Sequence, residues 1–146
     1  MRTALVAIFV LGVGVPAARA GSPGTMVLTA EQVDTADGDF EKNAKKKSIS
    51  TLAKSGEQWT LFFLAFLKKS AGSKEVQLVF YDTAEKKHEP TNAFPIETQP
   101  SAKILTSSVT FSADQGFKAG HKYNVMVTRL VGGHEDVYAR STLTLK

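Results

Sequence analysis

The sequence predicts an all-β protein, an antiparallel two-sheet sandwich of about seven strands that follows an N-terminal signal peptide. Three observations indicate this fold class. Short apolar segments with alternating side chains recur along the chain, glycine- or proline-bearing turns separate them, and no segment has the sustained 3.6-residue periodicity of a long amphipathic helix. With 146 residues, 42% of them apolar, the chain is long enough for one domain built on one core.

Residues 1–20 have the pattern of a signal peptide. Arg2 provides a positive start, Ala4–Val15 is an apolar run, and Ala18-Arg19-Ala20 fits the small-x-small cleavage rule. As a helix this run measures about 18 Å, short of the roughly 30 Å bilayer core, which disfavours a permanent anchor. We therefore expect cleavage after Ala20, a secreted or periplasmic protein, and no membrane span in the mature chain.

Composition limits the class of partner. The chain has 18 Lys and Arg against 14 Asp and Glu, and removal of Arg2 and Arg19 leaves 16 against 14, a net charge of +2. This charge is too small to indicate nucleic acid binding. The absence of Cys excludes thiolate zinc sites, redox pairs and Cys nucleophiles, and it favours a bacterial envelope protein over a disulfide-rich animal domain.

The mature chain divides into a leader at residues 21–47 and the sandwich core at residues 48–146. Met26 and Leu28 predict a short first strand within the leader. A basic connector follows, Asp34–Lys47, in which Phe40 and Ala44 lie at helical spacing, so we expect a loop with one helical turn.

The core begins with Ser48–Ala53, which predicts a strand that returns as a hairpin through the turn at residues 54–57. The next run, Trp59–Leu67, is apolar on both faces, which predicts a central strand whose second face is covered by a loop or by a partner. Glu75–Tyr81 follows a short turn at residues 70–73 and is expected to form a hairpin with this strand.

Four further strands complete the prediction. Ala93–Thr98 is expected at a sheet edge, because prolines surround it. Ile104–Ser112, Tyr123–Val131 and Asp136–Leu145 alternate apolar and polar side chains, with a hairpin tip at Gly132-Gly133. In the last strand we expect four side chains to face the core: Val137, Ala139, Leu143 and Leu145.

One short motif resembles a known family. Phe117-x-Ala119-Gly120-x-x-Tyr123-x-Val125-x-Val127 is similar to the tyrosine corner of fibronectin type III and related immunoglobulin-like domains, where the pattern is Leu-x-Pro-Gly-x-x-Tyr-x-Val-x-Val. Trp59 in an early strand is also similar to that family. Over residues 48–145 the resemblance implies strands B, C, E, F and G, and a Tyr123 hydroxyl bonded to backbone just upstream. It implies no function.

Candidate chemistry is sparse. His88, His121 and His134 lie in predicted turns, and a metal or small-ligand site would require them to converge with carboxylates. In the family's layout only the first two of these could meet. The acidic stretch Asp34–Glu41 lacks the spacing of a helix-loop-helix calcium site. No hydrolase or phosphate-binding motif occurs, so we expect no catalytic residue and no cofactor.

Lysines are the remaining asymmetry. They gather in two connections, and either they are solvated charges that protect strand ends or they bind an acidic envelope polymer or protein. The lysines concerned are Lys45, Lys46, Lys47, Lys68, Lys69 and Lys74. Taken together, the sequence predicts an exported, non-catalytic module for binding or scaffolding. The alternative is a periplasmic small-ligand or metal-binding protein that uses turn histidines and carboxylates.

Overall fold

The computed structural model describes residues 5–6 and 22–146, and its elements confirm the all-β prediction. Within these residues, one short α-helix and one 3-10 turn accompany the strands. In chain order the elements are β1 (Leu5–Val6), β2 (Thr25–Thr29), α2 (Phe40–Lys46), β3 (Thr51–Leu52), β4 (Gln58–Phe66), β5 (Glu75–Asp82), β6 (Asn92–Glu97), β7 (Ile104–Ser112), η2 (Ala113–Gln115), β8 (Lys122–Val131) and β9 (His134–Leu145).

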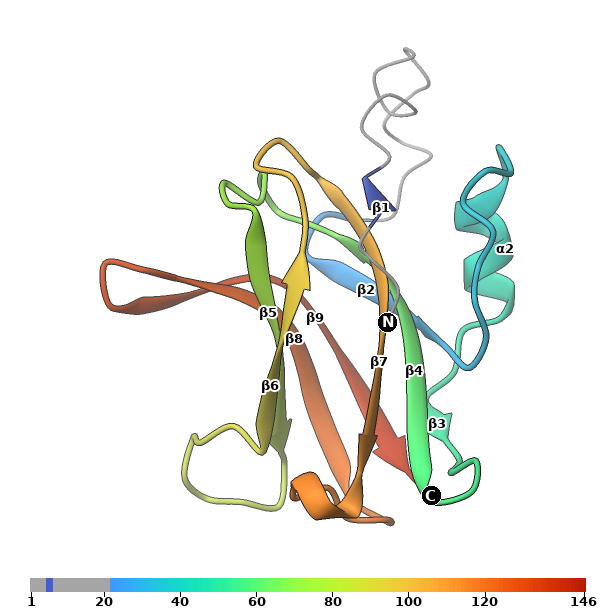
Figure 1. The fold of residues 1–146 in the computed structure, drawn as a ribbon, viewed down its shortest axis with the longest axis vertical. Coiled ribbons are helices and arrows are strands. Elements are labelled where there is room, and N and C mark those ends of the chain that lie inside the picture. The colour runs from blue at the N-terminus through green and yellow to red at the C-terminus, as the bar shows by residue number, and fades with distance from the viewer. Residues whose placement is uncertain (1–4, 7–21) are drawn as a thin grey trace.

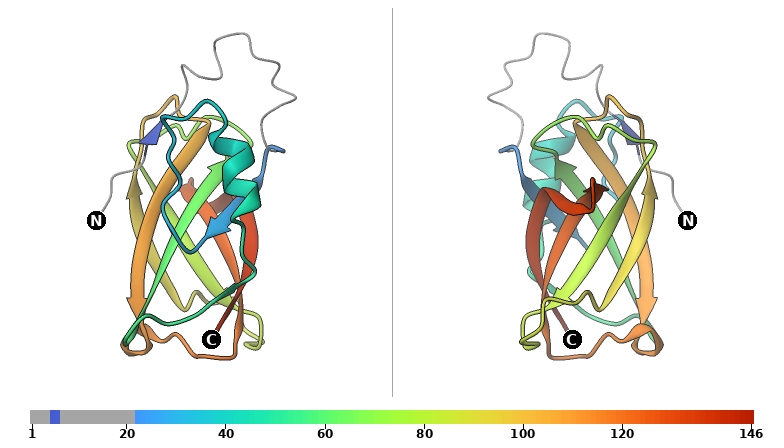
Figure 2. Two further views of the ribbon diagram at one scale, coloured as in Figure 1. Left: turned by 90° about the vertical axis from the view of Figure 1, so that its right-hand side faces the viewer. Right: turned by 90° about the vertical axis from the view of Figure 1, so that its left-hand side faces the viewer.

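The strands form one connected sheet in the order β1-β7-β4-β2-β9-β8-β5-β6, with β3 attached to β9. The sheet curls around its core into a nearly closed, barrel-like shape (Figures 1 and 2). Pairing is antiparallel except where β2 and β3 each pair with β9 in parallel. The prediction of two separate antiparallel sheets is therefore not confirmed. The predicted strands are present, but β2 pairs with both β4 and β9. It therefore links the strands that were expected to form two separate sheets.

Two predicted hairpins are wrong, although their strands exist. β4 pairs with β2 and β7, whereas β5 pairs with β6 and β8, so the chain between them crosses from one side of the core to the other. The connecting turn bonds elsewhere: the backbone N–H groups of Ala71 and Gly72 donate to the carbonyls of Ala102 and Pro100. Likewise, β3 pairs with β9 and does not return onto β4.

The leader contributes to the fold. β2 lies in the middle of the sheet between β4 and β9, and α2 packs against the same region. The predicted signal peptide, apart from Leu5 and Val6, lies outside the described residues. None of the helices in the described residues is long and apolar enough to cross a membrane.

The core is aromatic at one end. Phe80, Phe111 and Phe117 pack with ring centroids 4.3 to 5.1 Å apart, and Tyr123 contacts the same group. Trp59 is fully buried, and its indole N–H donates to the backbone carbonyl of Lys146 at 3.1 Å. Buried aromatic area of this kind is a large favourable contribution to folding in a chain without disulfides.

The second apolar face of β4 is covered by α2. Phe40 and Ala44, one turn apart on the helix, are buried against Leu64, Phe66 and Ile104. The helix lies over the outer side of the sheet (Figure 2). The prediction that this face is covered by a loop or a partner is thus met by the chain itself. It gives no argument for a partner at this face.

The predicted tyrosine corner is present as a local structure. Tyr123 is fully buried, and its hydroxyl accepts a hydrogen bond from the backbone N–H of Lys118 at 2.8 Å. Gly120 has a positive φ of 89°, and its N–H donates to the carbonyl of Leu145. The expected bond from the Tyr123 hydroxyl to upstream backbone is confirmed.

Candidate functional site

The six candidate lysines are exposed and lie in two places. Lys45 and Lys46 end α2, which Lys47 caps, whereas Lys68, Lys69 and Lys74 lie between β4 and β5. Two of them form ion pairs, Lys47 with Glu31 at 2.8 Å and Lys69 with Asp136 at 3.1 Å. Exposed pairs of this kind contribute little to stability. Lysine binding to an acidic partner stays a prediction.

The three histidines contact different groups. His121 Nδ1 lies 2.7 Å from Asp82 Oδ2, whereas the His88 ring stacks on Tyr81. His134 begins β9 next to the hairpin tip and is exposed. Among the residues the structure describes, no group of three or more His, Cys, Asp or Glu side chains could hold a metal ion.

Asp82 is a nearly buried carboxylate at the end of β5. Burial raises its pKa, but the hydrogen bond from the Ala84 N–H and the bond and charge of His121 outweigh burial, so the pKa of Asp82 is lower than usual. A pocket of about 220 Å³ lies beside it, lined by side chains of both charge signs, including Lys118. The contact between Asp82 and His121 joins the end of β5 to the start of β8.

Acidic side chains in the connector serve local turns. Asp34 accepts the N–H of Ala36, and Asp37 accepts the N–H of Asp39 and the Asn43 side chain. These bonds place the carboxylates at the entrance to α2, where they receive backbone donors.

A further apolar cluster lies on the outer face of the sheet, separate from the core and from the cluster under α2. It consists of Val79 and Tyr81 of β5 and Met126 of β8, with Val137 of β9 packed against them. The loop after β5 folds over it, since the His88 ring stacks on Tyr81 with centroids 4.0 Å apart. The outer face of these three strands is therefore partly apolar and partly covered.

Tyr81 and Glu135 connect the outer face to the β8–β9 hairpin. The Tyr81 hydroxyl donates to the Glu135 carboxylate, with oxygen–oxygen distances of 2.8 and 3.0 Å. Burial and the hydrogen bond and charge of Glu135 raise the pKa of Tyr81 to about 12. Tyr81 is therefore a neutral hydrogen-bond donor at physiological pH, and it holds the carboxylate in one orientation.

A β-bulge determines which side chains reach this face. β9 pairs Ala139 with Val127 and Val137 with Thr128, so Tyr138 is an extra residue. Tyr138 turns into the core, while Val137 lies on the outer face. The prediction that Val137 faces the core is wrong, because a strict two-residue alternation cannot pass through a bulge.

Beyond the bulge, the hairpin projects from the body of the molecule (Figure 1). Its end carries Leu130, 72% exposed, and Val131, 42% exposed, which are the exposed large hydrophobic residues of the described chain. A groove of about 620 Å³ runs from the hairpin along β5 to the start of β6. Its lining residues include Val79, Ala93, Thr128, Arg129, Leu130 and Glu135.

The residue patterns of the sequence did not predict this surface. One signal was available: Leu130 and Val131 directly precede Gly132-Gly133, where the flanks of an exposed turn are usually polar. The Tyr81–Glu135 contact joins residues far apart in the chain and has no local signal.

The chain was compared with protein-family models, with curated proteins and with solved structures. No family model, curated protein or solved structure matches it.

Proposed function

We propose that this protein is an exported, non-catalytic module that binds a protein partner through the β8–β9 hairpin and the groove beside it. The observation that carries the proposal is the pair of exposed apolar side chains, Leu130 and Val131, on a projecting hairpin. Apolar residues exposed together beside a groove are typical of interaction sites.

The chemistry of the groove favours a protein over a small charged ligand. Its lining is apolar at Val79 and Ala93, while Arg129 and the carboxylates of Glu75 and Glu135 provide charges of both signs. An apolar centre with a mixed polar rim is the usual composition of a protein interface. The alternative, a small ligand or metal held by histidines, has less support because His88 and His121 contact different carboxylates.

Export is proposed from the signal-peptide pattern of residues 1–20. The absence of Cys is compatible with a bacterial envelope. The sequence contains no recognised catalytic or cofactor motif, and we therefore propose a binding module.

We further propose that the architecture is related to the immunoglobulin-like sandwich. Strands matched to B and E of that family, β4 and β7, are neighbours, and those matched to C, F and G, namely β5, β8 and β9, are adjacent in the order C-F-G. These groups correspond to the two sheets of that fold. In this interpretation the parallel pairing of β2 with β9 joins the sheets along one side.

Site-specific photocrosslinking in the source cell tests the binding proposal. A photoreactive amino acid at position 130 of the full chain should give a discrete protein adduct. The matched control is position 142, where Thr142 is exposed on β9 away from the hairpin tip. An adduct of equal yield from both positions, or none from position 130, would contradict the proposal.

A second measurement concerns affinity for the identified partner. The double variant Leu130→Ser, Val131→Ser should weaken binding by roughly 100-fold or more, because the two lost apolar contacts, each worth about 1.5–3 kcal/mol when fully buried, together amount to about 3 kcal/mol or more. The unfolding midpoint should stay unchanged, since both side chains are exposed in the free protein. Unchanged affinity would place the partner elsewhere.

A further inference from the structure

On the side away from β4, β7 pairs only with the two-residue strand β1, and β7 has none of the usual protection of an edge strand. Its nine residues, Ile104–Ser112, contain no charged residue and no proline. At the other end of the strand order, β6 contains Pro95 and ends at Glu97. Proline and charge on an edge strand prevent pairing with another chain, and a long neutral edge without them is a template for such pairing.

In the full chain, this side of β7 already pairs with another strand. β1 pairs antiparallel with β7, with Leu5 opposite Thr106 and Val6 opposite Leu105. It lies beside the upper part of β7 (Figure 1) and covers two of the nine residues. β1 lies within the predicted signal peptide, so cleavage after Ala20 would remove it and leave β4 as the neighbour of β7.

We propose that the mature protein forms a symmetric dimer in which β7 pairs antiparallel with β7 of a second copy. In an antiparallel ladder, the side chains of opposite residues point to the same face of the sheet. In a symmetric pair, one residue must therefore lie directly opposite its own copy, with the two-fold axis between them. An axis at Ser108 aligns all nine residues, with Ile104 opposite Ser112 of the second copy. The two sheets would then continue into one another across the dimer.

The side chains fit this register. On the outer face, Thr106 would meet Thr110 of the second copy, and Ser108 would meet Ser108, pairs that are neutral and able to hydrogen-bond. Lys103 precedes β7 and Asp114 follows it. Antiparallel pairing therefore brings Lys103 of each copy near Asp114 of the other, so that opposite charges lie at both ends of the ladder.

This proposal goes beyond the binding function and uses a different surface. Residues of β5, β6, β8 and β9 and of the adjoining loops line the groove, and no residue of β7 does. A dimer would present two grooves to a partner.

A single cysteine tests the symmetry axis, because the chain has no Cys of its own. The sample is the processed protein secreted by cells that express the full chain, with its N-terminus determined by mass spectrometry. Ser108→Cys should give a disulfide-linked dimer on mild oxidation, since opposite Cα atoms in such ladders lie about 4.5–5.5 Å apart, within disulfide range. Thr106→Cys, the matched control, should stay unlinked, because its partner position holds threonine.

Charge variants test the pairing in solution by light scattering. The wild-type protein is expected to have the mass of a dimer. Thr106→Lys with Thr110→Lys should give monomers, because lysines then oppose one another in both cross-strand pairs. Thr106→Glu with Thr110→Lys should restore the dimer, which separates loss of pairing from loss of folding. Thr60→Lys, next to Thr110 on β4 and away from the edge, should leave the dimer intact.

Three outcomes of these measurements, and a fourth that concerns processing, would overturn the proposal. The first three are a monomeric wild-type protein, a dimer that persists in the double-lysine variant, and a Ser108→Cys protein that does not crosslink. A secreted protein that keeps residues 1–20 would overturn it too, since β1 would still occupy the edge.

Discussion

The Tyr123 hydroxyl accepts a hydrogen bond from the backbone N–H of Lys118, five residues earlier, at 2.8 Å. The bond closes the turn at Gly120 over the aromatic end of the core. Tyr123→Phe keeps the ring but leaves this N–H without its acceptor, so we expect a loss of about 1 kcal/mol in the free energy of unfolding. Urea denaturation measures it. A variant as stable as the wild type would show that the bond has no net effect.

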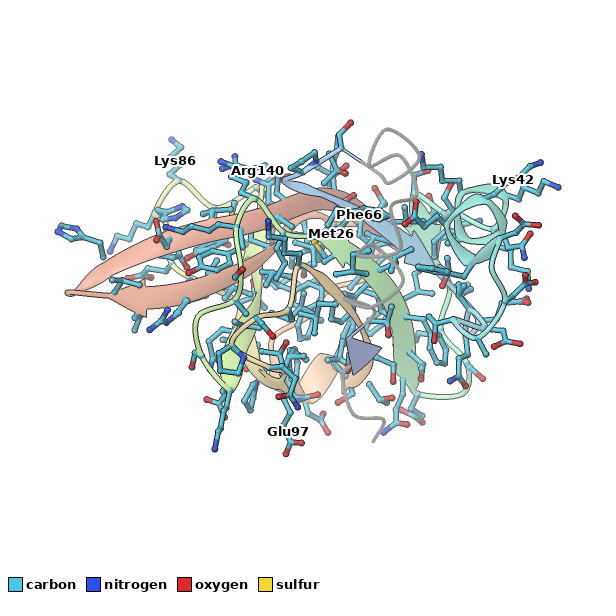
Figure 3. The ribbon with its side chains drawn as sticks, turned by 90° about the horizontal axis from the view of Figure 1, so that it is seen from above. Met26, Lys42, Phe66, Lys86, Glu97 and Arg140 are labelled. Carbon is cyan, nitrogen blue, oxygen red and sulfur yellow. The ribbon has the colours of Figure 1, made fainter. Side chains whose placement is uncertain are left out.

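The helix α2 is expected to stabilise the sheet by covering β4. Phe40 is buried against Leu64 and Phe66, so Phe40→Ala should cost about 3 kcal/mol or more and expose an apolar strand face. Lys42→Ala on the exposed side of the same helix is the control and should change stability by less than about 0.5 kcal/mol. Lys42 lies at the outer end of the molecule (Figure 3), whereas Phe40 is buried. Equal stability of the two variants would contradict the prediction.

Tyr81 should titrate at unusually high pH. Its pKa is raised to about 12, so its contribution to stability is complete below the ordinary tyrosine value near 10 and is lost as the pH rises toward about 12. Glu135→Gln removes the carboxylate charge and should lower the pKa of Tyr81. Ultraviolet absorbance of tyrosinate follows the titration, and Tyr81→Phe identifies the transition. No change in the Glu135→Gln protein would mean that the contact is absent in solution.

Asp82 should make the protein acid-sensitive. Because its folded-state pKa lies below the usual value, its stabilising contribution is complete above about pH 4 and is lost as the pH falls through the folded-state pKa. Asp82→Asn should lower stability at about pH 7 by about 1–3 kcal/mol and show a smaller loss on acidification. Denaturation midpoints at several pH values measure this. Parallel pH profiles for the two proteins would exclude Asp82 as the cause.

Local patterns predicted most strands but not their partners. The alternation of Ile104–Ser112, the tip at Gly132-Gly133 and the Tyr123 bond depend on residues close in sequence, and all three are found. The pairing of β4 with β7 and of β5 with β8 depends on packing across the core, which no short motif encodes. A tight turn at residues 70–73 suggested a hairpin, yet its backbone bonds to residues 100 and 102.

The proposed binding surface was harder to predict than the fold. It depends on the bulge at Tyr138, which turns Val137 outward, and on the long-range contact of Tyr81 with Glu135. A bulge adds one residue to a strand, and no particular residue type marks its position. The sequence therefore still appears to alternate between the two faces. The one local sign was the position of Leu130 and Val131 directly before Gly132-Gly133, because residues that flank an exposed turn are usually polar.

The position of β9 has a consequence for the order of folding. This strand, near the end of the chain, lies between β2 and β8 and also pairs with β3. Until β9 is in place, the strands preceding it form two groups, β7-β4-β2 and β8-β5-β6, with no ladder between them. Pairing β2 with β9, which are adjacent in the sheet but far apart in the sequence, requires closing a long loop. This slows folding to the millisecond-to-second range typical of such topologies. We therefore expect a chain truncated before residue 134 to be unable to reach the native state, and folding to be completed only after β9 has been synthesised.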